Sequence, residues 1–246
     1  MVTKGSELIV VSETSSTNEW ISQRFDSLQH GSAVMAYYQT AGKGQVANSW
    51  ESERGKNVLL SVLLEPVKIP IDRQFLLSEL IALSVLDVLH NQLKLAVCIK
   101  WPNDIYVGDK KIAGLLIENS VSATIMCKSV IGIGLNVNQT AFVSDAPNPV
   151  SMRQLTNREF NLPQLALSLC HRIKERYAQF DLSQAEGLHA DYFRHLYRHV
   201  GFHLFQCGDE VFEAEIEAVC LTGHLCLHTK KGDHLVFAFK EVKFVI

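Results

Sequence analysis

The sequence predicts an α/β (α+β) fold in which a mixed sheet forms the larger part and a small SH3-like β-barrel follows it. The hydrophobic pattern alternates between strand-like and helix-like periods up to about residue 200, which is typical of helices packed on a sheet. From Gly201 onward, turn residues separate short apolar runs, and about 45 residues of this kind favour a small barrel. The 246 residues and their 47% hydrophobic content suffice for a sizeable core. We therefore expect two domains, at residues 1–200 and 201–246.

Local signals place the first elements. A helix is expected after Ser16, because Ser16 and Glu19 have the S-x-x-E spacing of a capping box and apolar residues follow at helical spacing. A long helix should begin near Asp72 and extend to about Leu93. A glycine-rich loop covers residues 40–56. Strands are expected at residues 8–11, 33–38, 57–64 and 95–100.

The centre of the chain is predicted to continue with strands. Gly108-Asp109 is a hairpin signal between strands at residues 104–107 and 111–118, and a strand at residues 124–137 could pair with the second arm. Helices are expected afterwards, at residues 162–180 and 183–200. The barrel strands should lie at residues 203–207, 211–220, 224–228, 234–239 and 242–246.

One helical segment carries a spacing that could indicate a metal site. Asp191, His195 and His199 follow one another at intervals of four residues. A helical wheel places both histidines on the same face as Arg194 and Arg198, whose charges would repel a cation. A solvated helix face is therefore the better interpretation.

Composition and charge exclude several classes of function. A net charge of −3, from 23 basic and 26 acidic residues, lacks the positive excess that nucleic-acid binding requires. No run approaches the roughly 18 apolar residues of a membrane span, and the N-terminus does not have the pattern of a secretory signal. The six cysteines include no CxxC pair, so we expect free thiols in a reducing cytosol. These observations favour a soluble, cytoplasmic protein without a nucleic-acid or membrane partner.

The segment with the most chemical information is KWPNDIYVGDKKIAG, which runs from Lys100 to Gly114. It places a lysine, a rigid turn and the Asp104 carboxylate close to Lys111, whose neighbours are small or apolar, and this pattern is typical of a protected site for anions. KWPND followed by K-[IL]-A-G resembles the signature of the biotin protein ligases. The resemblance extends over nearly the whole chain, because that family also carries a C-terminal barrel. It implies a catalytic domain of the biotin/lipoate ligase type, in a short form, since the strand pattern begins at about residue 7 and leaves no room for a DNA-binding domain before it.

The resemblance implies a reaction in two steps. The carboxylate of biotin attacks the α-phosphate of ATP to give biotinyl-5′-adenylate, and a lysine of a biotin carboxyl carrier protein then attacks this mixed anhydride. Two anions must meet in the first step, so fixed cations and Mg²⁺ are expected to neutralise their repulsion. Lys111 is predicted to bridge both anions. Asp104 is predicted either to organise Mg²⁺-bound water or to assist deprotonation of the acceptor lysine, and no protein ligand of the metal is assigned with certainty.

The glycine-rich loop corresponds to the biotin- and adenylate-binding loop of that family, often written G-R-G-R-x-G-R-x-W. Gly42 and Lys43 are expected to contact biotin, while Lys43, Gln45 and Trp50 are expected to contact ATP or the adenylate. Lys43 and Gln45 stand where two arginines are usual, and Ala47 replaces the third glycine. Because Gln45 supplies no charge, weaker retention of the adenylate is expected.

The other implied site residues lie on separate segments. Ser16 and Thr17 match the S-T-N motif of the family, and their hydroxyls are expected to meet the ureido ring of biotin together with the Gln39 amide. Ser16 could also serve only as a helix cap. The remaining expected contacts are Gly114 with biotin, and Asn103, Lys111 and Asn136 with ATP or the adenylate.

The sequence therefore predicts an ATP-dependent biotin protein ligase. Its expected small molecules are biotin, ATP and Mg²⁺, and its expected partner is the biotin carboxyl carrier domain of a biotin-dependent carboxylase. A lipoate ligase would share the fold and the adenylation chemistry, but the R-x-x-G-G-G loop of such ligases is absent. A protein that binds biotin without transferring it is the second alternative, and only Gln45 and Ala47 favour it.

Overall fold

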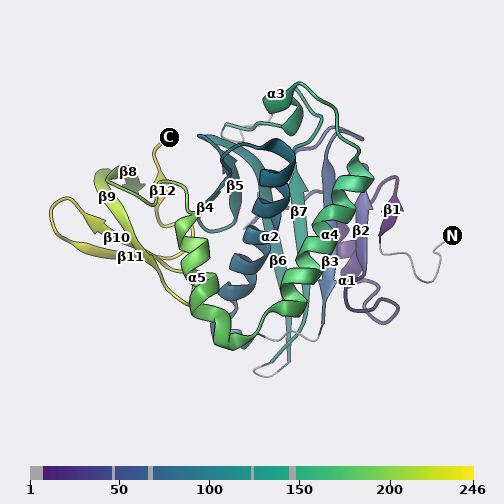
Figure 1. Cartoon of the computed structure of the whole chain (residues 1–246), viewed down its shortest axis with the longest axis horizontal. Helices are drawn as coiled ribbons and strands as arrows, with labels where there is room; N and C mark the ends of the chain where they lie inside the picture. Colours follow the sequence, from purple (N-terminus) through teal and green to yellow (C-terminus); the bar gives the residue numbers. More distant parts are fainter. Residues whose placement is uncertain (1–7, 46–47, 66–68, 123–124, 144–147) are drawn as a thin grey trace.

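The computed structural model describes residues 8–45, 48–65, 69–122, 125–143 and 148–246. These residues form a seven-stranded mixed sheet and, beside it, a five-stranded antiparallel sheet (Figure 1). The order of the larger sheet is β1-β2-β3-β7-β6-β5-β4, in which β1 and β2 are parallel and all other neighbours are antiparallel. Its strands are β1 (Ile9–Val11), β2 (Ala33–Ala36), β3 (Val58–Leu64), β4 (Cys98–Lys100), β5 (Asp104–Val107), β6 (Lys110–Ser122) and β7 (Ile125–Leu135).

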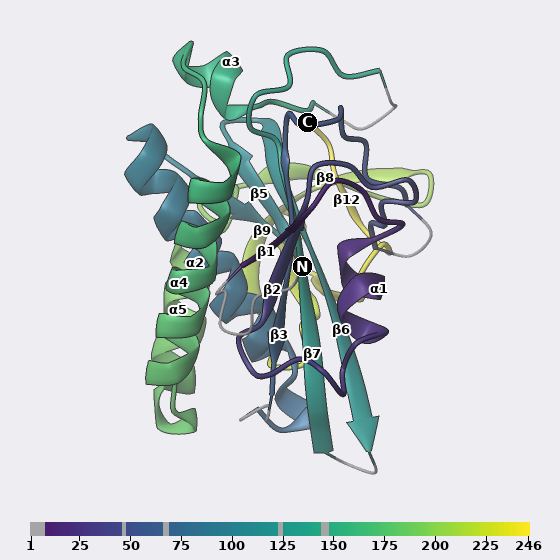
Figure 2. The same cartoon turned by 90° about the vertical axis from the view of Figure 1, so that its right-hand side faces the viewer.

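Helices cover both faces of this sheet. Figure 2 shows the sheet edge-on, with α2, α4 and α5 on one side and α1 on the other. The α1 side therefore carries a single short helix. The helical elements are α1 (Thr17–Ser22), η1 (Ile71–Arg73), α2 (Phe75–Leu93), α3 (Met152–Thr156), α4 (Leu162–Gln179), η2 (Leu182–Gln184) and α5 (Ala185–Arg194).

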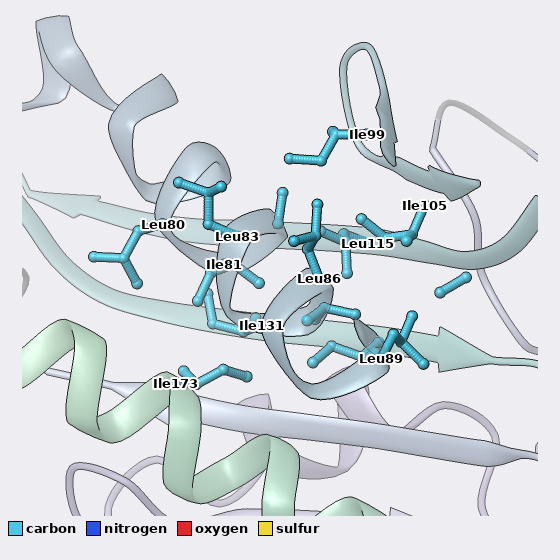
Figure 3. Packing of buried hydrophobic residues seen from close by; sticks show 14 of the residues in the cluster. Leu80, Ile81, Leu83, Leu86, Leu89, Ile99, Ile105, Leu115, Ile131 and Ile173 are labelled. Carbon is cyan, nitrogen blue, oxygen red and sulfur yellow. The ribbon is translucent and has the colours of Figure 1, made fainter. Parts of the chain in front are cut away.

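The main core lies between the sheet and the helices α2 and α4. All seven residues of β3 are buried, because both faces of a central strand are covered in this arrangement. Leu80 and Leu83 of α2 pack with Ile131 of β7 and Ile173 of α4 (Figure 3). Each fully buried side chain of this size contributes about 1.5–3 kcal/mol relative to exposure. The sheet that carries the site is therefore firmly packed against these helices.

The second sheet follows the last helix. Its order is β11-β10-β9-β8-β12, and every pair is antiparallel. Ring contacts at 4.9–6.3 Å join Phe205 to Phe212 and Phe244, and Phe212 to Phe237, so the phenylalanines of four strands form one inner face. All five expected strands are confirmed within two residues at each end. They are β8 (His203–Cys207), β9 (Glu210–Val219), β10 (Leu225–Thr229), β11 (His234–Phe237) and β12 (Lys243–Phe244).

The helix expected after Ser16 is confirmed, but the capping box predicted there is wrong. Ser16 is the N-cap residue of α1, but its side chain makes no capping hydrogen bond, and Glu19 instead accepts one from the Ser15 hydroxyl at 2.7 Å. The capping box of this fold lies at Ser151, whose hydroxyl accepts from the Gln154 N–H at 3.2 Å while its own N–H donates to the Gln154 side chain at 2.9 Å.

The helices are also shorter than the periodicity predicts. The long helix is preceded by the turn η1, so α2 starts at Phe75, although it ends at Leu93 as expected. The last helix stops at Arg194, where its chain turns to form a bridge with β4. His195 and His199 are therefore not on a continuous helix, and no group of three metal-ligating side chains occurs in the described part of the chain.

Helix α2 is long and apolar enough to cross a membrane by length and composition, although no membrane span was predicted from the sequence. However, 72% of that window is buried inside the fold. A buried core helix passes the same test, so the helix is weak evidence for a membrane span.

Candidate functional site

Lys111 and Asp104 form an ion pair at the centre of the site. The Lys111 ammonium lies 2.7 Å from an Asp104 carboxylate oxygen, and about a fifth of each side chain is exposed. Asp104 is the first residue of β5 and is paired in register with Gly114 of β6, so the hairpin itself brings the two charges together. The main chain of Lys111 is fixed from the other side by hydrogen bonds with Asn148 and Val150, both at 2.9 Å. The two residues expected to carry the chemistry are thus adjacent, ordered and accessible.

Two glycines form a slot beside this pair. Gly114 and Gly134 face each other across β6 and β7, and the indole of Trp50 lies over both. A Cβ atom on Gly114 would come within 2.9 Å of the indole and 3.3 Å of the Lys111 side chain, and one on Gly134 would lie closer still. The glycines are therefore needed to admit a flat ring against the strands. The Lys111 ammonium is 5.5 Å from the centre of the Trp50 ring.

The Trp50 indole is not fully satisfied in this position. Its Nε1 atom is buried and has no hydrogen-bond partner within the described residues. An unpaired buried donor costs about 1–3 kcal/mol, so an acceptor from a ligand would stabilise this arrangement.

A polar cluster lies farther along the same face of the sheet. The Gln39 side-chain oxygen accepts hydrogen bonds from the Thr17 N–H at 2.7 Å and from the Thr17 hydroxyl at 2.9 Å. The Ser61 hydroxyl lies 2.7 Å from the Thr17 hydroxyl and 2.6 Å from the side-chain amide oxygen of Asn18. Gly132 pairs in register with Ser61 and leaves room for Asn18, because a Cβ there would lie 2.5 Å from the Asn18 oxygen. Hydroxyl and amide groups are thus concentrated at one place.

Asn18 and Ser61 are the residues of this cluster that sequence reasoning missed. Both are buried, and the Asn18 amide also donates to the Glu118 carboxylate at 2.6 Å. Two signals were present in the sequence: Asn18 is the third residue of the S-T-N motif, and Ser61 is the single polar residue in an apolar strand. A lone buried hydroxyl in a strand needs a partner, which is why its position carries information.

The glycine-rich loop folds over the α1 side of the sheet. Gly42 and Trp50 are joined by a backbone hydrogen bond of 3.0 Å, and a Cβ on Gly42 would lie 2.8 Å from the Trp50 carbonyl oxygen. Lys43 forms an ion pair with Glu19 at 2.5 Å, and this hydrogen bond raises the pKa of Lys43. Lys43 is therefore held at the first turn of α1 and not beside Lys111. Ala47, which was noted as a departure from the family pattern, lies outside the described residues.

Gln45 and Asn103 line a pocket of about 200 Å³ near the start of α2. The side-chain amide oxygen of Gln45 (Oε1) is buried without a hydrogen-bond partner in the described structure. Asn103 and Leu115 exchange hydrogen bonds of 2.5 Å and 3.0 Å, which fix the turn before Asp104. The other lining residues are Gln74, Phe75, Ser78, Ile117, Asn119 and Thr222.

The remaining predicted residues occupy the rim and the end of the slot. Ser16 is buried beside Thr17, at the start of α1. Asn136 follows β7 and is 4% exposed, with its main chain bound to Ile112 at 2.9 Å and to Met152 at 3.1 Å. The fold thus brings Lys111, Asp104, Gly114 and Trp50 together, and separately joins Thr17 with Gln39.

Lys100 and Trp101 link the site to the second sheet. The Lys100 ammonium lies 5.4 Å from the Tyr106 ring centre and 5.0 Å from that of Phe244 in β12, and burial lowers the pKa of this lysine. The Trp101 indole N–H donates to the Gly223 carbonyl at 2.9 Å. Trp101 itself is buried, with 4% of it exposed. The bond to the second sheet was not predicted.

Comparisons with known proteins agree with this geometry. The sequence model of the biotin/lipoate A/B protein ligase family matches residues 9–136, just over half of the chain. The chain belongs to this family. Within the family, it is 30% identical to a biotin--[acetyl-CoA-carboxylase] ligase of Mycobacterium tuberculosis over 191 residues, covering 76% of this chain and 69% of that protein. It is also 31% identical to the bifunctional ligase/repressor BirA of Escherichia coli over 184 residues, covering 75% of this chain and 56% of that protein.

The ligase fold extends over almost the entire chain. The biotin protein ligase of Aquifex aeolicus, solved in complex with biotin and ATP, superposes with a TM-score of 0.80, covering 97% of this chain and 99% of that chain at 23% sequence identity. The mixed sheet and the second antiparallel sheet are therefore those of a biotin protein ligase fold. The chain spans between a third and just over half of the length of the bifunctional ligase/repressors that it matches.

Proposed function

We propose that this protein is an ATP-dependent biotin protein ligase, which forms biotinyl-5′-AMP and transfers biotin to a lysine of a carrier protein. One observation carries the proposal. Along one face of the sheet, the hydroxyl and amide groups of Thr17, Gln39 and Ser61 are followed by the glycines of β6 and β7 and then by the Lys111 ammonium. Biotin has the same polarity, since its ureido ring offers a carbonyl and N–H groups and its side chain ends in a carboxylate.

The hydroxyl and amide groups suit the ureido ring. Thr17, Gln39, Ser61 and Asn18 provide both hydrogen-bond donors and acceptors, as a ring with a carbonyl flanked by N–H groups requires. Ser16 lies beside them and adds a hydroxyl. Gly132 and Gly134 are two residues apart on β7, so roughly 7 Å at the usual strand rise separates the position of the Asn18 amide from that of the Trp50 indole.

Lys111 acts where the two anions meet. Its ammonium binds the biotin carboxylate and the α-phosphate, and it stabilises the charge that develops when the carboxylate oxygen bonds to phosphorus and pyrophosphate leaves. Asp104 acquires a role that neither sequence-based alternative included. Because it lies 2.7 Å from the ammonium, it positions Lys111 before the substrates arrive. We assign Trp50, Asn103 and Asn136 to nucleotide binding, because each contacts β6, the strand that carries Lys111.

Lys43, Gly42 and Gln45 belong to the covering loop. The side-chain amide oxygen of Gln45, which lacks a partner, belongs to a residue that lines the same pocket as Asn103 and can accept from the ribose or from water at the phosphate. Mg²⁺ would enter with ATP and would neutralise part of the phosphate charge.

The chain order supports a division of labour between two domains, residues 1–200 and 201–246. The slot is built from strands and loops before residue 140, whereas the second sheet begins at His203. The second domain contributes by packing on Lys100 and Trp101, next to the ion pair. We place the reaction in the cytoplasm. We take a biotin carboxyl carrier domain as the acceptor, because one relative is named a biotin--[acetyl-CoA-carboxylase] ligase.

Transfer of biotin to a carrier tests the proposal directly. The protein is incubated with biotin, ATP, Mg²⁺ and a biotin carboxyl carrier domain, and the carrier is probed by streptavidin blotting. We expect a biotinylated carrier only when ATP is present. A carrier labelled with lipoate but not with biotin would replace the proposal by a lipoate ligase. Binding of biotin without any transfer would replace it by a binding protein.

A further inference from the structure

Two cysteines of the second sheet lie within reach of each other. The Sγ atoms of Cys220 and Cys226 are 3.2 Å apart, and both residues are half-buried. Cys220 directly follows β9 and Cys226 lies in β10, so a tight hairpin turn connects them. The Cys220 N–H closes this turn on the His224 carbonyl at 2.7 Å. A disulfide bond needs about 2.05 Å between sulfurs, so a small adjustment of the hairpin would suffice.

We propose that Cys220 and Cys226 form a reversible disulfide and are a redox modification site of this protein. The inference does not depend on the proposed function. The spacing of these cysteines in the sequence, with five residues between them, does not match a redox motif, and only the hairpin brings the sulfurs together. Cytosolic disulfides are usually transient and redox-sensing, which is the class to which this pair belongs.

The chemistry requires an oxidant with a disulfide bond, such as oxidised glutathione. Burial and the neighbouring Cys220 thiol raise the pKa of Cys226 to about 11, so Cys226 is protonated at neutral pH and Cys220 makes the first attack. The Cys220 thiolate bonds to one sulfur of the oxidant and releases the other as a thiol. Cys226 then loses its proton and attacks Cys220, which releases the second thiol. Two protein thiols are oxidised while one small disulfide is reduced to two thiols.

The position of the hairpin connects this pair to the candidate site. Gly223 lies between the two cysteines, and its carbonyl accepts the Trp101 indole N–H at 2.9 Å. Gly223 also has a φ of +89°, and a Cβ there would lie 2.6 Å from the Phe75 ring. The turn is thus packed too tightly to move alone. Drawing the sulfurs together will therefore alter the contact between the turn and Trp101.

Peptide mapping tests the disulfide on the full-length wild-type protein. Cleavage after Glu217 and Glu241 yields the fragment 218–241, which contains Cys220 and Cys226 and no other cysteine. After treatment with oxidised glutathione, we expect this fragment to be lighter by two hydrogen atoms, and dithiothreitol should restore its mass. Recovery of the fragment as two thiols or only as glutathione adducts would overturn the proposal.

Cysteine variants test the order of the two thiol attacks. Cys226→Ser is expected to accumulate a glutathione adduct on Cys220, because the second attack cannot occur. Cys127→Ser is the matched control, since Cys127 is exposed and lies on the other sheet, and it should leave disulfide formation unchanged. A disulfide that forms only when Cys127 is present would overturn the assignment.

The coupling between the disulfide and the Trp101 indole is tested separately by NMR. In ¹⁵N-labelled protein, the Trp101 indole N–H signal, assigned with Trp101→Phe, should shift on oxidation, while the Trp20 signal should not. The shift should be absent in Cys226→Ser. A disulfide that leaves the Trp101 signal in place would refute the coupling.

Discussion

Replacing Lys111 with methionine is expected to remove most adenylation activity while the fold and biotin binding persist. Methionine keeps much of the length and apolar stem of lysine but removes the charge. The charge matters most when the α-phosphate becomes more negative, so its loss should act on the transition state more than on bound biotin. Removing one preorganised group of this kind costs about 10²–10³ in rate, or about 2.7–4 kcal/mol. We therefore expect biotin-dependent pyrophosphate exchange to fall by that factor.

The effect of this substitution on stability should be smaller. At 2.7 Å, the attraction between Lys111 and Asp104 is about 1.5 kcal/mol in water and about 6 kcal/mol at an effective dielectric constant of 20. Both side chains are about a fifth exposed, so desolvation and side-chain entropy offset most of this attraction. The free energy of unfolding should fall by about 1 kcal/mol. Urea unfolding measures this value, and calorimetric titration measures biotin binding.

Lys110→Met is the matched control for this experiment. Lys110 is the neighbouring residue on β6, but it is exposed and lies outside the ion pair. Its substitution should leave pyrophosphate exchange unchanged. Unchanged exchange in Lys111→Met, or an equal loss in Lys110→Met, would refute the role assigned to the Lys111 charge.

Further predictions concern the loop, the slot and the pH dependence of stability. Gln45→Arg should slow the release of labelled biotinyl-adenylate several-fold in a chase experiment, because a charge-assisted hydrogen bond exceeds a neutral one by about 1 kcal/mol; equal or faster release would contradict this. Gly132→Ala should cost about 1–3 kcal/mol in urea unfolding, because its methyl group would lie 2.5 Å from a buried asparagine oxygen, whereas Gly187→Ala in α5, with open space around it, should stabilise by up to about 1 kcal/mol. The hydrogen bond with Glu79 raises the pKa of His189, and burial raises that of Glu79, so both groups bind protons more tightly in the folded state. The stability that these protons contribute should be fully present at low pH and should be lost as the pH rises, for His189 from about 6.5 upward. His189→Gln should flatten the dependence of the free energy of unfolding on pH, and an unchanged dependence would contradict the assignment.

The strands and the chemistry-bearing motif could be predicted because their signals are local. The hairpin at Gly108 follows from a glycine and an aspartate between apolar runs, and the fold confirms it. The hairpin in turn places Lys111 beside Asp104, so the central ion pair needed only local information and one correct register. The predicted capping box at Ser16 failed because the S-x-x-E pattern records spacing and not the partner that each side chain finds. In the fold, Glu19 is drawn to Ser15 and Lys43 instead.

The fold class, the second sheet and the motif that carries Lys111 could be predicted from the sequence, because apolar periodicity, turn residues and short-range spacing are signals within a few residues of one another. The distant groups that complete the site could be identified only in the folded structure. Ser61 joins Thr17 across 44 positions, and Gly223 reaches Trp101 across 122. Such contacts depend on sheet register and on the packing of one sheet against another, and a one-residue slip would turn these side chains to the opposite face. The pairing of Cys220 with Cys226 has the same origin, since only the geometry of the β9–β10 turn brings their sulfurs to 3.2 Å.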